Sequence, residues 1–215
     1  MQTAHSYPAF INIVYRSVSW SRAAMVTSMW IVVVCGCTQK TREHAPDVSA
    51  LLDRGNAHLE KDEYEQATTF FTEAISIAPN DFRGYLYRSH VFMEQYEHEK
   101  EIADLTEVIR LKPDAEAYRN RGSSYIAAKD YPQAITDLTE AIRLEPGFTA
   151  AYETRAYAHF LNKDFQMAIP DFTRVIDARP TDSATYVRRA ECYEKIGKRG
   201  QAAADRLKAI NLDRR

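Results

Sequence analysis

The chain has 215 residues, of which 45% are hydrophobic and 27% are charged, with only seven glycines. This composition excludes a largely disordered or collagen-like chain. The formal net charge of −2 gives no bulk electrostatic reason to bind nucleic acid or an anionic membrane, because both usually call for a basic excess. We therefore expect one folded body and no nucleic-acid partner.

The first 42 residues have the layout of a secretory signal. They contain four basic residues and no acidic residue, and an apolar or small run extends from Ala23 to Val34. At about 12 residues, this run would span about 18 Å as a helix, less than the roughly 30 Å of a bilayer core. This segment is therefore predicted to be a targeting signal rather than a membrane-spanning helix.

The tetrad Val34-Cys35-Gly36-Cys37 ends the apolar run. It resembles a bacterial lipobox, which implies a signal peptide over 1–36, lipidation of Cys37 and a tether over 37–47. The tetrad departs from the pattern because Cys35 stands where alanine or serine is usual. An uncleaved anchor and a soluble secreted form are the alternatives.

The residue after the expected anchor bears on location. Thr38 is not the aspartate that resembles an inner-membrane retention signal. The resemblance therefore implies a membrane attachment through the N-terminal lipid, at the periplasmic face of the bacterial outer membrane.

Four prolines recur along the rest of the chain at spacings of 34, 33 and 34 residues: Pro79, Pro113, Pro146 and Pro180. A fixed period of this length indicates stacked supersecondary units. Each unit contains two amphipathic segments with the period of helices. The sequence therefore predicts five helical hairpins, over residues 48–81, 82–114, 115–148, 149–182 and 183–215.

Small residues in these segments carry a resemblance to the tetratricopeptide repeat. The small position of the first helix is Gly55, Ser89, Gly122, Ala156 and Ala190. The small position of the second helix is Ala67, Ala134, Ala168 and Ala202. The resemblance covers about residues 48–215 and implies an all-α fold, a right-handed α-solenoid of five hairpins. It also implies an interaction scaffold rather than an enzyme.

Two residues depart from the repeat pattern. Glu101 occupies the alanine position of the second unit, which predicts a more open or locally shifted hairpin. Pro170 lies inside the second helix of the fourth unit, where a missing N–H and a ring clash cost about 3 kcal/mol unless the helix starts late or kinks. We expect the main irregularity in the fourth unit.

An arginine occupies the same position of the first helix in every unit: Arg54, Arg88, Arg121, Arg155 and Arg189. Sixteen residues later, units two to five carry an aspartate: Asp104, Asp137, Asp171 and Asp205. The first unit has Phe70 there. This spacing predicts four arginine–aspartate pairs within hairpins, and a ladder of anion-binding arginines is the alternative.

The last helix is more polar than its counterparts. Arg206 stands where the other second helices place Phe or Leu. Either this helix caps the stack with a wet outer face, or its exposed side pairs with another chain. A homodimer is therefore an open alternative.

No catalytic constellation stands out in the sequence. There is no Gly-rich phosphate loop, His-Glu-x-x-His or G-x-S-x-G motif. We expect His58 and His159 in core packing, His90 and His98 on no common helical face, and Cys192 as a buried thiol. The sequence predicts no catalytic residue, no metal site and no cofactor.

In tetratricopeptide proteins the concave face is lined by outward positions of the first helices. Carried over by register, the resemblance implies a partner-binding groove formed by Asn56, Tyr87, His90, Arg119, Asn120, Ser123, Tyr157, Phe160 and Arg188. Aromatic anchors with nearby arginines suit an extended peptide or a partner helix. Only Asn56 matches the positions of carboxylate-clamp members, so that ligand class is disfavoured.

The leading hypothesis is a lipid-anchored scaffold in the bacterial envelope that binds a protein or peptide partner in this groove. The second is a co-chaperone that holds extended client segments. The third is an enzyme with an unrecognised site.

Overall fold

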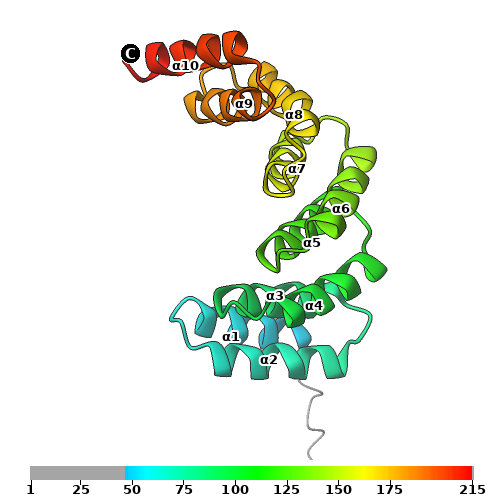
Figure 1. The fold of residues 1–215 in the computed structure, drawn as a ribbon. Coiled ribbons are helices and arrows are strands. Elements are labelled where there is room, and N and C mark those ends of the chain that lie inside the picture. Colours follow the sequence, from blue (N-terminus) through cyan, green and yellow to red (C-terminus); the bar gives the residue numbers. More distant parts are fainter. Residues whose placement is uncertain (1–46, 215) are drawn as a thin grey trace, which may run out of the picture. The chain divides into compact units, whose positions relative to one another are not determined.

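The computed structural model describes residues 47–214. The expected signal peptide, Cys37 and the tether up to residue 46 lie outside the described residues. Within them the fold is all-helical (Figure 1), and the helices are α1 Val48–Leu59, α2 Tyr64–Ile77, α3 Phe82–Glu94, α4 His98–Leu111, α5 Ala115–Ala127, α6 Tyr131–Leu144, α7 Thr149–Leu161, α8 Phe165–Ala178, α9 Ser183–Lys195 and α10 Arg199–Asp213. Consecutive helices pair into five hairpins, which confirms the predicted fold class.

The first helices of hairpins one to three begin next to aspartates that cap them. Asp47, Asp81 and Asp114 precede α1, α3 and α5, and each carboxylate accepts a hydrogen bond from a backbone N–H of the first turn, at 2.8 to 3.0 Å. Such a cap satisfies one of the N–H groups that an α-helix leaves without an internal partner. The caps fix where these first helices start.

Each hairpin reverses direction through one residue with positive φ, between 59° and 79°. These residues are Asp62, Tyr96, Lys129, Lys163 and Gly197. The left-handed conformation closes the first helix and redirects the chain into the second. Only the last hairpin uses a glycine, and the Tyr96 side chain, 81% exposed, projects into solvent at the second turn.

Small residues let the two helices of a hairpin approach closely. A Cβ built on Gly55 would lie 2.3 Å from Cε1 of Phe71, and one on Gly122 would lie 2.8 Å from Cγ of Leu138. Both large partners belong to second helices and are fully buried. In the first and third hairpins the core therefore contains a large side chain of the second helix packed directly against a glycine of the first helix.

Pro170 does not delay the start of α8. That helix runs from Phe165 to Ala178, with the same 14 residues as α2, α4 and α6. Of the two accommodations expected for Pro170, the helix does not use a late start. Pro170 lies on the exposed side of the helix, where the carbonyl of Gln166, which loses its N–H partner and faces the proline ring, can tilt toward solvent.

Glu101 is buried at the junction of the second and third hairpins, with 6% of its surface exposed. Ser124 Oγ in α5 donates a hydrogen bond to Glu101 Oε1 at 2.6 Å, and His98 Nδ1 lies 3.4 Å from Glu101 Oε2. A buried carboxylate is tolerated only when it has such partners. Glu101, which departs from the alanine pattern, therefore has a hydrogen-bond donor in the next hairpin, the hydroxyl of Ser124.

Candidate functional site

The arginine–aspartate pairs predicted from the 16-residue spacing are confirmed in hairpins two to five. In each pair the arginine Nε donates to one carboxylate oxygen at 2.8 Å, and Nη2 donates to the other at 2.7 to 2.9 Å. The aspartate side chains are 6 to 10% exposed and the arginine side chains 15 to 20%. The hydrogen bond to the carboxylate raises the pKa of each arginine above its usual value.

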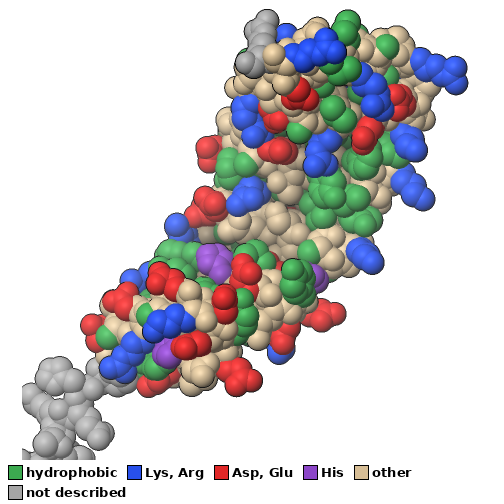
Figure 2. All heavy atoms as spheres, turned by 90° about the vertical axis from the view of Figure 1, so that its left-hand side faces the viewer, with side chains coloured by type: hydrophobic (Ala, Val, Ile, Leu, Met, Phe, Trp, Pro, Cys, Tyr) green, Lys and Arg blue, Asp and Glu red, His purple; other side chains and the backbone are tan. Residues whose placement is uncertain are grey.

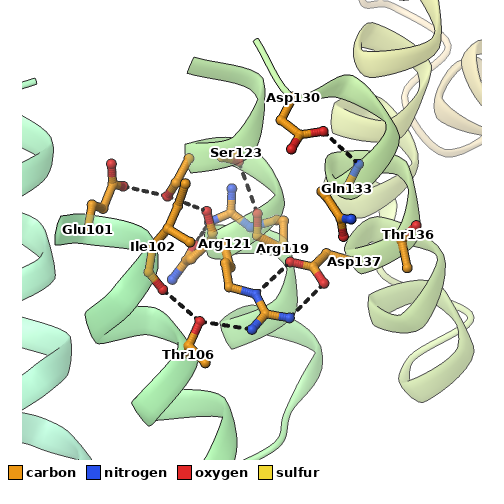
Figure 3. Close-up of polar contacts among 12 residues, drawn as sticks. Glu101, Ile102, Thr106, Arg119, Arg121, Ser123, Asp130, Gln133, Thr136 and Asp137 are labelled. Atoms are coloured by element: carbon orange, nitrogen blue, oxygen red, sulfur yellow. Dashed lines mark hydrogen bonds and ion pairs between the residues drawn. The ribbon is translucent and has the colours of Figure 1, made fainter. Parts of the chain in front are cut away.

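The third nitrogen of each paired guanidinium reaches the preceding hairpin. Nη1 donates to a threonine hydroxyl of the preceding second helix at 2.9 to 3.1 Å, and these threonines are Thr72, Thr106, Thr139 and Thr173. Figure 3 shows one such unit, in which Arg121 joins Asp137 to Thr106. The four guanidiniums bind the array together, so they do not form an anion-binding ladder.

A cavity opens between α3 and α5, on the face formed by the first helices, which we call the first-helix face. It has a volume of about 270 Å³ and is lined by Phe82, Leu86, His90, Val108, Lys112, Asp114, Glu116, Ala117 and Asn120. Lys112 Nζ lies 3.0 Å from Asp114 Oδ2 and 4.8 Å from the centre of the Phe82 ring. Burial lowers the pKa of His90 below its usual value, so the lining of this cavity has no unpaired positive charge near neutral pH.

A second cavity of about 230 Å³ opens farther along the first-helix face, between α7 and α9. Glu153, Thr154, Tyr157, Phe172 and Arg188 line it. The Arg188 guanidinium carbon lies 5.2 Å from the centre of the Tyr157 ring, within the range of a cation–π interaction. Glu153 is engaged by Arg179. This cavity therefore combines an aromatic wall with an accessible guanidinium.

Family comparisons agree with this repeat geometry. Models of the tetratricopeptide repeat match residues 48–81, 97–147 and 119–183, which is more than half of the chain. The chain belongs to the tetratricopeptide-repeat family. Tetratricopeptide repeats are in general non-catalytic scaffolds. No curated protein matches the chain.

Several solved tetratricopeptide structures are similar to the array. The crystal structure of the MamA protein has 22% identity and a TM-score of 0.74, and the match covers 78% of this chain and 92% of that one. MamA from Desulfovibrio magneticus RS-1 has 16% identity, a TM-score of 0.72, and coverage of 78% and 95%. YrrB, described as a tetratricopeptide protein with an unusual peptide-binding site, has 16% identity, a TM-score of 0.69, and coverage of 77% and 86%. At these identities the likeness shows the fold alone.

The tetratricopeptide array divides the expected groove residues into three groups. His90 and Asn120 line the α3–α5 cavity, and Tyr157 and Arg188 line the α7–α9 cavity. Beside the first cavity, Arg119 donates to Asn120 Oδ1 at 2.8 Å, and Ser123 donates to the Arg119 carbonyl at 3.1 Å. Arg119 and Ser123 themselves line neither cavity, and the remaining three residues lie away from both. Tyr87 and Phe160 pack against hydrophobic clusters, and Asn56 is half-buried on α1.

Sequence reasoning missed the cavity residues that do not belong to first helices. Val108 comes from α4, Phe172 comes from α8, and Lys112 lies in the loop after α4. A register argument confined to first helices cannot find them. Their common signal is position, because each lies in the second half of a second helix or just after it.

The thiol of Cys192 is buried in the core of the array. Cys192 is fully buried against Ala156, Ala168 and Phe172, and burial raises the pKa of its thiol to about 11. Within residues 47–214, no cluster of three or more His, Cys, Asp or Glu residues is placed to hold a metal ion. In the same part of the chain, no helix has the length and apolar character needed to cross a membrane.

Proposed function

We propose that the array is a non-catalytic scaffold that binds an extended segment of a protein partner along its first-helix face. The observation that carries this proposal is the pair of cavities on that face, between α3 and α5 and between α7 and α9. Each lies at a junction of successive hairpins, so a ligand that crosses several hairpins would meet both. Small apolar pockets with a few polar groups at the rim suit the side chains of an extended peptide.

The comparison with YrrB supports this proposal at the level of fold. YrrB is described as having a peptide-binding site, and its helical array covers 77% of this chain. Fold alone does not transfer a ligand. The proposal for this chain therefore depends on its own cavities and on the side chains that line them.

Site-directed photocrosslinking tests the scaffold function. A benzophenone amino acid is placed at Asn120, in the α3–α5 cavity, or at the exposed Gln133 of α6 as the matched control. The protein is illuminated with a pool of random 12-residue peptides. Adducts at position 120 and none above background at position 133 are the expected result. Equal labelling of both positions would refute binding on the first-helix face.

The same crosslinking experiment separates the scaffold from a co-chaperone. A scaffold selects a restricted set of peptides with shared side chains at fixed spacing. Crosslinks to unrelated peptides without a common pattern would instead indicate a groove that holds extended client segments weakly.

We also propose that the array is attached to the bacterial envelope by a lipid on Cys37, at the periplasmic face of the outer membrane. The support is the tetrad Val34-Cys35-Gly36-Cys37 and the threonine that follows it. The test is the intact mass of membrane-extracted protein, compared with a Cys37→Ser variant. A chain that begins at Cys37 and carries acyl groups, absent from the variant, is expected. An unmodified full-length mass would overturn this proposal.

A further inference from the structure

We propose that the partner segment is acidic where it crosses the α7–α9 cavity, and that Arg188 binds its carboxylate while a neighbouring apolar side chain enters the cavity. This inference rests on the proposed scaffold function and specifies its ligand.

Arg188 differs from the four arginines that pair with aspartates. Its neighbour Arg189 donates hydrogen bonds to Asp205 and Thr173. Arg188 is exposed, and no carboxylate among residues 47–214 lies within ion-pair distance of it. The one carboxylate in the cavity lining, that of Glu153, is paired with Arg179. The N–H groups of Arg188 are therefore available to a ligand.

The cavity holds this guanidinium in a defined place. The Tyr157 ring lies 5.2 Å below it, and a guanidinium stacked on an aromatic ring presents its N–H donors at the edge of the stack. A carboxylate accepts two such N–H bonds side by side, which a neutral amide cannot match. Phe172, only 1% exposed, forms part of the apolar lining beside it. The two features together fit an acidic residue adjacent to an aromatic or aliphatic one.

The α3–α5 cavity has a different preference. Its lysine is paired with Asp114, and Arg119 beside it lies 3.5 Å from Glu116. Burial keeps His90 largely neutral near pH 7, because its pKa is lowered. This cavity offers no free cation, so it suits an uncharged apolar side chain. A ligand that spans both cavities must therefore place its acidic residue at the α7–α9 end.

The charge of the array points the same way. Residues 48–114 contain 14 acidic and 7 basic residues, whereas residues 183–214 contain 4 acidic and 8 basic residues. Figure 2 shows basic side chains gathering toward the end that carries α10 and acidic side chains over the opposite end. The first two hairpins repel an acidic segment and the last hairpin attracts it. Local geometry and the field of the array thus favour the same ligand polarity.

The experiment uses two fluorescein-labelled 12-residue peptides and the full chain. One contains the sequence Asp-Phe-Glu at its centre, and the other contains Asn-Phe-Gln there. In fluorescence anisotropy titrations at low salt, we expect the acidic peptide to bind about tenfold more tightly than the amide peptide, as a charge-assisted two-point hydrogen bond implies.

The Arg188→Ala variant should lose most of this preference, because only the weaker attraction of the basic last hairpin remains. The matched control is Arg174→Ala, because Arg174 also lies over a tyrosine ring, at 6.0 Å from the centre of Tyr152, but belongs to the second helix α8. The control should retain the tenfold preference. An undiminished tenfold preference in Arg188→Ala would overturn the inference.

The outcomes for the inference and for the scaffold function are distinguishable. Equal binding of both peptides by the native chain overturns the acidic ligand and leaves the scaffold function in place. Failure of both peptides to bind also overturns the inference, and crosslinking of the random pool at position 120 then decides whether the scaffold function stands.

Discussion

Arg121 and Asp137 face each other across the third hairpin and share two parallel hydrogen bonds, at 2.8 and 2.9 Å. The third guanidinium nitrogen of Arg121 donates to Thr106 of the second hairpin at 3.1 Å. The Arg121 side chain therefore links the two helices of its own hairpin and also links that hairpin to the preceding one.

The Arg121–Asp137 pair should be strongly coupled. Removal of one partner leaves the other charge largely buried without its counter-ion, so Arg121→Ala and Asp137→Ala should each lower the free energy of unfolding by about 2 to 4 kcal/mol. The double variant should lose much less than the sum of the two. Urea denaturation of the four proteins measures the coupling. Additive losses would show that the two residues act independently, and the exposed pair Glu140–Arg143 is the control in which near-additivity is expected.

Thr106→Val should weaken the junction between the second and third hairpins. The substitution keeps the shape and removes the hydroxyl that accepts from Arg121, so we expect a loss of about 1 kcal/mol in the free energy of unfolding. The control is Thr136→Val, since Thr136 is exposed and its hydroxyl bonds only to the Pro132 carbonyl. Equal effects of the two substitutions would show that the contact between hairpins contributes nothing.

Two glycine-to-alanine substitutions should change the stability of the fold in opposite directions. Gly55→Ala places a Cβ 2.3 Å from the buried Phe71 ring, and such overpacking should destabilise the fold by about 1 to 3 kcal/mol. Gly200→Ala in α10 places a Cβ with no atom within 4 Å, and it should stabilise the fold by about 0.4 to 1 kcal/mol. Thermal unfolding followed by circular dichroism measures both. A neutral Gly55→Ala would mean that the first hairpin opens at no cost.

His159 should make the array less stable in acid. It is 9% exposed, and burial lowers its pKa, with Asp171 and Asp164 nearby raising it and Arg155 lowering it. The unfolded chain takes up the proton first, near pH 6.5. Stability should therefore fall as the pH drops below that value.

Replacement of His159 by phenylalanine should reduce this acid sensitivity. Phenylalanine is already the residue at the equivalent position of α3, Phe92. Urea midpoints at pH 7.5 and 5.5 should differ less for His159→Phe than for the native chain, with His90 contributing the remaining difference. An unchanged difference would show that His159 takes up a proton as readily in the folded chain as in the unfolded one.

The repeat and its ion pairs could be predicted because they recur. The repeat period, the small positions and the 16-residue spacing from Arg88 to Asp104 each appear several times. The repeats of this one sequence can therefore be compared with one another. The threonine partners recur too, as Thr72 does before Arg88. They were missed because a hydroxyl between two hairpins leaves no charge pattern in the sequence.

The cavities could not be predicted in the same way. Tyr87 and Arg188 occupy the same position of their first helices, yet Tyr87 packs in a hydrophobic cluster while Arg188 lines a cavity. The orientation of such a side chain depends on how successive hairpins pack, which spacing along one hairpin does not specify. Pro170 is a similar case, because its tolerance depends on which side of α8 faces solvent.

The hydrogen bond between Ser124 and Glu101 gives the hairpins a fixed order. At the Glu101 position the other second helices have alanine, and at the Ser124 position the other first helices have Ala57, Val91, Ala158 and Cys192. Any transposition that seats α4 beside a different first helix would enclose its carboxylate without a hydroxyl. Units of this array are therefore not interchangeable building blocks, and a shuffled or circularly permuted version must carry α4 and α5 together.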